Sequence, residues 1–171
     1  MERLLKWLEI PIHLTLWVGL LAAALMMSHV TADVAGRGFL NRPIDGTTEI
    51  VAVYYMVAVA YLPWAWVARN DGHIKVELFM NFLPLRVVWW IEIVVKALTA
   101  LYVGTFAWRS SLRAMQQTGL NEMWLAGTRY IPVWPSRWIL PFAGALMCLY
   151  LVLRIAADLR AGYGAESGKS E

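Results

Sequence analysis

Four long apolar blocks, separated by short polar connections, constrain this chain more than any other feature of its sequence. In a helix that rises about 1.5 Å per residue, each block is long enough to cross the roughly 30 Å hydrocarbon core of a bilayer. Because water is absent there, each block must satisfy its own backbone hydrogen bonds, which favours helices. We therefore expect four transmembrane helices with both termini on one side of the membrane, at residues 10–35, 49–68, 87–108 and 131–157.

The composition supports a membrane protein with a single domain. Apolar residues make up 60% of the 171 residues and charged residues only 16%, whereas soluble domains carry about 25% charged residues. We expect an all-α integral membrane protein with one four-helix domain at residues 1–160 and a disordered tail at 161–171. The first apolar block is too long for the hydrophobic region of a signal peptide, so we expect it to remain as an anchor.

Several classes of function are disfavoured. Lys and Arg residues never form a run or a stripe, so the formal charge of +3 gives no support for nucleic-acid binding. The single cysteine, Cys148, cannot form a disulfide framework or a thiol redox pair. No nucleophile, metal cluster or pair of carboxylates stands at a workable spacing. We therefore expect no enzyme activity, no cofactor and no metal.

Tryptophan positions indicate where the membrane surfaces lie, because indole rings favour the headgroup level. One group falls near the surface on the N-terminal side (Trp7, Trp64, Trp66, Trp89 and Trp90) and another near the opposite surface (Trp108, Trp124, Trp134 and Trp138). Apart from the intramembrane lysine, eight Lys and Arg residues fall on the N-terminal side and six on the other. By the positive-inside rule, this small excess predicts cytoplasmic termini.

The three connections carry different expectations. Residues 36–46 are rich in turn formers and predict a tight outer loop. Between the second and third spans, Glu77 and Asn81 share a helix face, which predicts a short amphipathic helix in the cytoplasmic headgroup plane. Residues 109–130 predict a polar outer loop with a helical piece at 112–117.

Glu92 and Lys96 lie inside a predicted span, where charged groups are costly and often functional. Their i, i+4 spacing allows each to neutralise the other on one face of the third helix. An ion pathway normally leaves a carboxylate free to exchange its partner. We therefore interpret the pair as a static polar contact, either with the other helices or with a partner subunit.

The connection between the second and third spans resembles that of a known family. Its motif consists of Arg69, Gly72-His73-Ile74, Glu77 and the pair Leu83-Pro84. Glu49 at the start of the second helix and residues 135–141 before the fourth fit the same pattern. Together these features resemble the small membrane subunit of tripartite ATP-independent periplasmic (TRAP) transporters.

This resemblance implies a scaffold subunit in the bacterial inner membrane, in contact with membrane lipids. Its partner would be a larger permease that carries the substrate and sodium sites. A soluble periplasmic binding protein would deliver the substrate, an organic acid. Two alternatives stay open: the small subunit of a tripartite tricarboxylate transporter, and a stand-alone small transporter.

Charged residues near the membrane surfaces and within the spans are the candidate contacts. Contacts with the larger subunit or with lipid are assigned to Glu49, Arg69, His73, Glu77, Glu92 and Lys96. Contacts with the binding protein, through complementary charge, are assigned to Arg37, Arg42 and Asp45, with Arg113 and Arg129 in the other outer connection. The alternative for the outer residues is solvated loop charge, and the alternative for His73 is a hydrogen bond within its own turn.

Overall fold

The computed structural model describes residues 2–70 and 84–161. In this part of the chain, four helical segments are long and apolar enough to cross a membrane, which confirms the predicted fold class. The first and third are the continuous helices α1 (Glu2–Leu40) and α6 (Leu85–Gly119). The second is divided into α2 (Thr47–Ile50), the π-helical turn η1 (Val51–Tyr55), α3 (Met56–Tyr61) and α4 (Trp64–Arg69). The fourth comprises the 3-10 turn η2 (Ser136–Trp138) and α7 (Ile139–Ala161).

The helices differ from the apolar blocks in length. α1 continues to Leu40, so residues 36–40 are helical where a loop was predicted. α6 continues to Gly119, so the helical piece predicted at 112–117 is part of this helix and not a separate element of the loop. The end of α6 is polar but rich in good helix formers, which hydropathy does not register. The fourth span begins at Ser136, five residues later than predicted. The predicted amphipathic helix, with His73 and Glu77, and the tail from residue 162 lie outside the described residues.

Pro63 interrupts the second membrane segment. Its ring nitrogen has no hydrogen to donate, and α3 ends two residues before it, at Tyr61. α1 packs against this break at Gly19: a Cβ added there would lie 3.4 Å from Pro63 Cγ. A small residue on one helix thus faces the break in its neighbour.

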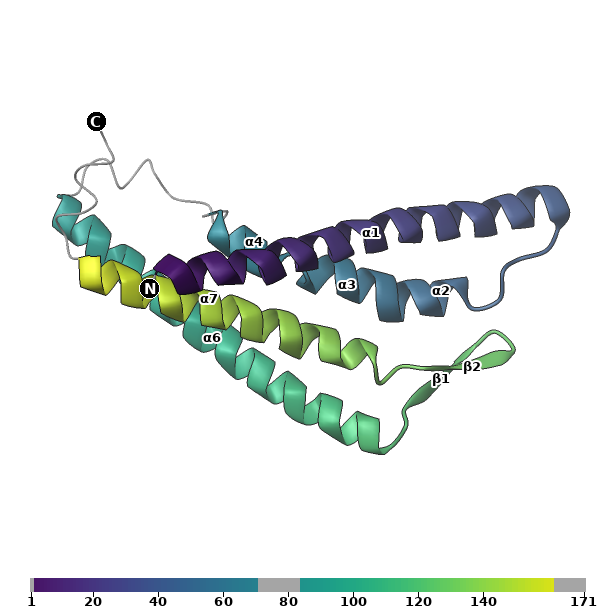
Figure 1. The fold of residues 1–171 in the computed structure, drawn as a ribbon. Helices are drawn as coiled ribbons and strands as arrows, with labels where there is room; N and C mark the ends of the chain where they lie inside the picture. Colours follow the sequence, from purple (N-terminus) through teal and green to yellow (C-terminus); the bar gives the residue numbers. More distant parts are fainter. Residues whose placement is uncertain (1, 71–83, 162–171) are drawn as a thin grey trace.

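The four segments form two helical hairpins that meet at one end, which we call the closed end (Figure 1). α1 packs against α3 and α4, and α6 packs along α7. α7 is central because it also contacts α4, α3 and α1. The apolar core lies toward the closed end and includes Ile12, Ala65, Ala68, Ala100, Leu146, Met147, Tyr150 and Leu151.

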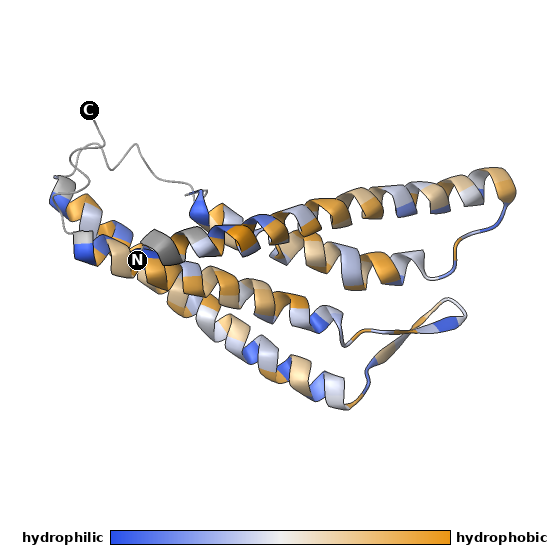
Figure 2. Ribbon diagram, viewed as in Figure 1, coloured by the Kyte–Doolittle hydropathy of each residue, from blue (hydrophilic) through white to orange (hydrophobic). Residues whose placement is uncertain are grey.

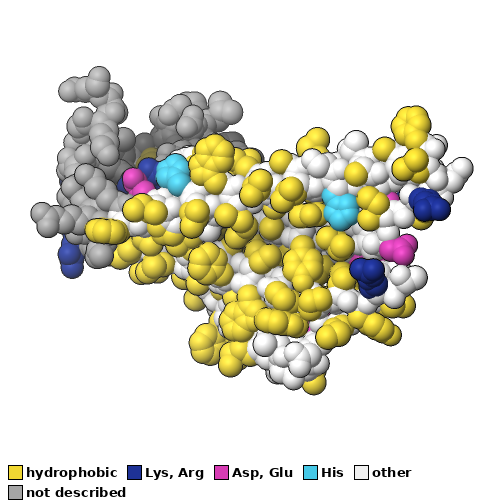
Figure 3. All heavy atoms as spheres, turned by 45° about the vertical axis from the view of Figure 1, so that its right-hand side comes forward, with side chains coloured by type: hydrophobic (Ala, Val, Ile, Leu, Met, Phe, Trp, Pro, Cys, Tyr) yellow, Lys and Arg dark blue, Asp and Glu magenta, His cyan; other side chains and the backbone are white. Residues whose placement is uncertain are grey.

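Apolar side chains cover the flanks of the bundle. In the most apolar stretch of α7, 44% of the residues are buried. In the corresponding stretches of α1 and α6, only 17% of the residues are buried. Hydrophobic residues predominate through the middle of the helices (Figure 2), and charged side chains on the face in Figure 3 gather near its two ends. This distribution fits helices that face lipid or another apolar surface.

A β-hairpin, which the sequence did not predict, follows α6. β1 (Met123–Ala126) pairs antiparallel with β2 (Arg129–Pro132), and residues 127–128 form the turn. Gly127 adopts a φ of 60°, a left-handed conformation that costs glycine little. The hairpin reaches toward α2 (Figure 1) and β1 contacts it. We call this the hairpin end of the bundle.

Candidate functional site: polar contacts at the two ends of the bundle

The intramembrane pair Glu92 and Lys96 belongs to a larger cluster near the closed end. The Lys96 ammonium nitrogen lies 3.3 Å from Glu92 Oε2 and 3.0 Å from Asp158 Oδ2 on α7. Arg154 Nε lies 3.5 Å from the other carboxylate oxygen of Asp158. Two cations therefore face two carboxylates, and their formal charges cancel.

Asp158 and Arg154 are the two members of this cluster that the sequence did not indicate. Asp158 stands 62 positions after Lys96, and its i, i+4 spacing with Arg154 offered a closer partner on its own helix. Of the two contacts expected for the pair, with the other helices or with a partner subunit, the structure contains the first, between α6 and α7. The Lys96, Glu92 and Asp158 side chains are 14–25% exposed within the chain.

Arg69, at the end of α4, joins that helix to α1. Its Nη2 lies 2.8 Å from Glu9 Oε1, and its Nη1 lies 2.8 Å from His13 Nε2. Arginine can only donate, so His13 accepts through Nε2 and must carry a proton on Nδ1 instead. Glu9 and His13 stand four residues apart on α1, and this shared helix face was the available signal in the sequence.

At the hairpin end, Asp33 holds the connection that follows α1. Its carboxylate accepts a 2.7 Å hydrogen bond from the backbone N–H of Ile44 and lies 2.7 Å from Arg37 Nη2. The backbone N–H of Arg42 donates to the Gly36 carbonyl at 3.1 Å, while the Arg42 side chain is exposed. Of these two predicted docking residues, Arg37 has an ionic partner within the chain.

Asp45, the third predicted docking residue, links this connection to the β-hairpin. Its Oδ2 accepts a 3.1 Å hydrogen bond from the Thr128 hydroxyl, 83 positions away. The two segments approach closely: a Cβ added at Gly127 would lie 3.0 Å from Asp45 Cβ, and one at Gly46 would lie 2.9 Å from Ala126 Cβ. Glycine is required at this contact because any side chain would hold the segments apart.

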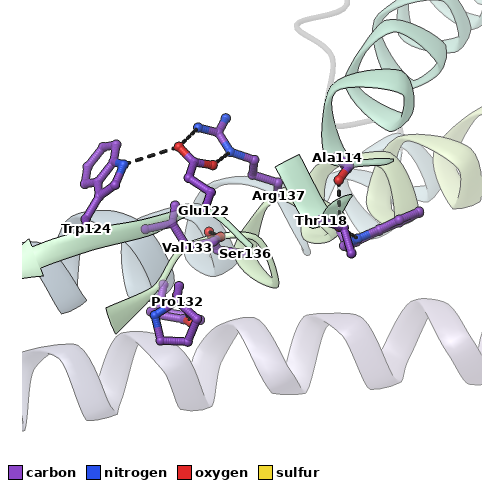
Figure 4. A network of polar contacts seen from close by, with 10 residues as sticks. Ala114, Thr118, Glu122, Trp124, Pro132, Val133, Ser136 and Arg137 are labelled. Carbon is purple, nitrogen blue, oxygen red and sulfur yellow. Dashed lines mark hydrogen bonds and ion pairs between the residues drawn. The ribbon is translucent and has the colours of Figure 1, made fainter. Parts of the chain in front are cut away.

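The base of the hairpin is fixed by Glu122 and Arg137 (Figure 4). Arg137 donates to one Glu122 oxygen through Nη2 at 2.7 Å and to the other through Nε. Trp124 Nε1 donates to the same carboxylate at 3.3 Å. The hydrogen bonds from Arg137 above all hold the pKa of Glu122 below its ordinary value. The Tyr54 hydroxyl donates to the Pro132 carbonyl and so joins the second membrane segment to β2.

The other predicted residues lie apart from these contacts. Glu49 is half-buried in the first turn of α2, Arg129 is exposed on β2, and Arg113 is exposed on α6 beside a cleft. Among the described residues, no group of three or more His, Cys, Asp or Glu side chains is placed to hold a metal ion. The polar contacts therefore join neighbouring segments and do not converge on one site.

One family model matches the chain. It is described as the DctQ component of tripartite ATP-independent periplasmic transporters, and the match covers residues 26–161, well over half of the chain. No curated protein matches the chain.

Proposed function

The chain belongs to the family of DctQ components of tripartite ATP-independent periplasmic transporters, and on this premise we propose that it is the scaffold of such a transporter. In this role the four helices bind a larger permease within the bilayer and enlarge its fixed frame. The larger permease carries the substrate and sodium sites. A periplasmic binding protein delivers the substrate, an organic acid.

Family membership favours this class of function over the two alternatives. The family is a transporter component and not an enzyme family. The DctQ family is also distinct from the small subunits of tripartite tricarboxylate transporters, which were the first alternative. A component of a tripartite system is expected to need its partners, which argues against a stand-alone transporter.

The observation that carries the scaffold role is the cluster around Lys96. An ion-coupling site needs a carboxylate that can exchange its partner as the ion binds and leaves. Glu92 and Asp158 instead share the Lys96 ammonium, and Asp158 also pairs with Arg154. A neutral network of this kind between two helices supports a rigid bundle.

The flanks of α1 and α6 support binding to an apolar partner. Large apolar side chains there are widely exposed, with Trp17 67% exposed on α1 and Leu101 66% exposed on α6. We propose that the larger permease covers one flank and lipid the other. Glu49 and Arg69, with His73 and Glu77 beyond the described residues, stay proposed contacts of that partner or of lipid.

We further propose that the protein lies in the bacterial inner membrane with its closed end in the cytoplasm. The small excess of Lys and Arg on that side supports this orientation. The hairpin end then faces the periplasm, where the binding protein docks. Among Arg37, Arg42 and Asp45, Arg42 is the strongest candidate contact, because its side chain is exposed and the other two have internal partners.

Reconstitution tests the proposed function. Proteoliposomes would contain the larger permease with and without this chain, together with the binding protein and an inward sodium gradient. Uptake of organic acids, beginning with a four-carbon dicarboxylate, would be measured. We expect uptake only when all three proteins are present. Uptake by this chain alone, or full uptake without it, would contradict the scaffold role.

Co-purification tests whether the Lys96 cluster also contacts the partner. In the double variant Glu92→Leu, Lys96→Leu, Asp158 keeps Arg154, so the bundle should still fold. We expect weaker co-purification of the larger permease with this variant. Val95→Leu, at an exposed position between the two, is the matched control. Unchanged co-purification would confine the cluster to a role within this chain.

A further inference from the structure

A cleft opens at the hairpin end, between the two helical hairpins. α7 contacts both α6 and the second membrane segment. The cleft lies between α6 and the second segment, beside the start of α7. Its volume is about 290 Å³. The wall from the second segment is apolar and includes Val53, Val57 and Tyr61, while α6 contributes Ser110 and Arg113. We call this space the hairpin cleft.

Arg113 is the uncompensated cation of the hairpin cleft. The other arginine in its lining, Arg137, is already bound by both oxygens of Glu122. Arg113 is exposed and has no ion pair with any carboxylate of the described residues. A ligand of the cleft is therefore expected to carry a negative charge at this position.

The polar and the apolar lining described above come from different walls of the cleft. Trp108 marks the membrane surface on α6, and Arg113 follows it by five residues, or roughly 8 Å of helix. This position is at the level of the lipid phosphates. On the opposite wall, Val53 and Tyr61 are eight residues apart, so the apolar part extends over roughly 12 Å. A cleft with a cation on one wall and an apolar slot along the other is complementary to an amphiphile.

From this geometry we propose that the hairpin cleft binds a phospholipid. Its phosphate lies against the Arg113 guanidinium, and one acyl chain lies in the slot between Val57 and α6. The site lies within this chain, between its two helical hairpins, and it does not depend on the proposed transport function. A bound lipid would fill the space that the diverging helices leave open.

Native mass spectrometry of the full-length protein in detergent tests this site, with phosphatidylglycerol as the probe. Arg113→Gln is compared with Arg109→Gln, which removes an exposed charge one helical turn away, outside the cleft lining. We expect the wild type and Arg109→Gln to retain the lipid. Arg113→Gln should bind it about tenfold more weakly, as expected for the loss of a charge-assisted hydrogen bond. Both positions are exposed, so neither variant should impair folding.

Two further comparisons test the two parts of the ligand. Val57→Trp fills the slot and should reduce retention of phosphatidylglycerol even though Arg113 is intact. Diacylglycerol, which lacks the phosphate, should bind the wild type and Arg113→Gln equally. Equal loss of phosphatidylglycerol in the Arg109 and Arg113 variants would overturn the proposal. Displacement of the lipid by free glycerol phosphate would also overturn the proposal, because it would assign the cleft to a soluble anion. Displacement of the lipid by the larger permease would overturn it too, because it would assign the cleft to the partner.

Discussion

The ammonium nitrogen of Lys96 lies 3.0 Å from Asp158 Oδ2, although the two residues stand 62 positions apart on different membrane helices. The same nitrogen lies 3.3 Å from Glu92 Oε2 on its own helix, so one ammonium group pairs with two carboxylates. Removal of the cation should cost more than removal of one carboxylate, because it leaves two negative charges close together at low dielectric.

Lys96→Met should therefore lower the free energy of unfolding by on the order of 3 kcal/mol, the scale for removing one partner of a buried ion pair. Glu92→Gln should cost less, because Lys96 keeps Asp158. The midpoint of thermal unfolding in detergent would establish the order. The neutral triple variant Glu92→Gln, Lys96→Met, Asp158→Asn should recover most of the loss. A triple variant as unstable as Lys96→Met would show that charge is not the cause.

The close contact of α6 with α7 at Gly144 leads to a second prediction. A Cβ added at Gly144 would lie 3.0 Å from the Cβ of Ala107. Neither atom can rotate away, so Gly144→Ala should separate the helices and cost about 1–3 kcal/mol of stability. Adding Ala107→Gly should restore the contact, apart from the cost of about 1 kcal/mol for glycine inside a helix. Thermal unfolding in detergent measures both variants.

Gly38 provides the matched control for this prediction. Gly38 is within α1, and apart from its chain neighbours and the backbone of its own helical turns no atom lies within 4 Å of a Cβ added there. Gly38→Ala should be neutral or should stabilise the protein by about 0.5–1 kcal/mol, because alanine has less backbone freedom to lose. Equal losses at Gly38 and Gly144 would contradict the packing explanation.

The sequence predicted the number and the type of the membrane helices because both follow from local physics. An apolar block long enough to cross the bilayer must be helical whatever its neighbours are. Proline lacks the donor that a helix needs, but among the described membrane helices only Pro63 accompanies a break, whereas Pro11 lies inside the continuous helix α1, so proline alone does not locate the interruption. Of the extension of α6 to Gly119, only a helical piece at 112–117 was predicted, because the last turns of α6 are polar and hydropathy does not join them to the membrane helix. The β-hairpin was missed for a different reason: its strands are four residues each and depend on contacts with other segments.

The polar contacts were predicted only where their partners are close in sequence. Glu92 and Lys96 stand at i, i+4, and that spacing alone brings them together. Asp45 is different, because its partner Thr128 is brought to it only by the folded connection. A charged loop residue without a visible partner in the sequence was therefore interpreted as a docking residue.

The contact between Asp45 and Thr128 gives a third prediction. If Asp45 acts through the hairpin, then Asp45→Ala and Thr128→Val remove the same interaction. Their effects on binding-protein-dependent uptake should then be non-additive, with a coupling of about 0.5–1.5 kcal/mol. Arg42→Glu, at an exposed side chain, should instead add independently to Thr128→Val. Additive effects of Asp45→Ala and Thr128→Val on the uptake rate would favour direct docking by Asp45.

The hydrogen bonds from Arg137 to Glu122 make the base of the hairpin sensitive to acid, which is the fourth prediction. Because the pKa of Glu122 is lowered in the folded state, the contact stabilises the fold fully above the ordinary glutamate pKa of about 4.3. That stabilisation is lost as the pH falls through the lower, folded-state pKa. The hairpin should therefore stay docked at neutral and mildly acidic pH and loosen only in stronger acid.

Fluorine NMR of protein labelled with 5-fluorotryptophan measures this transition, because Trp124 donates to the same carboxylate. The Trp124 signal, assigned by its absence in Trp124→Phe, should shift with a midpoint below the ordinary glutamate pKa. In Glu122→Gln the signal should not titrate, and it should already resemble the acid form because Arg137 has lost its charged partner. A midpoint at or above the ordinary value in the wild type would show that Arg137 does not stabilise the carboxylate. The hairpin would then be held mainly by Tyr54, which contacts Pro132 near the base, and by Asp45, which contacts Thr128 at the turn.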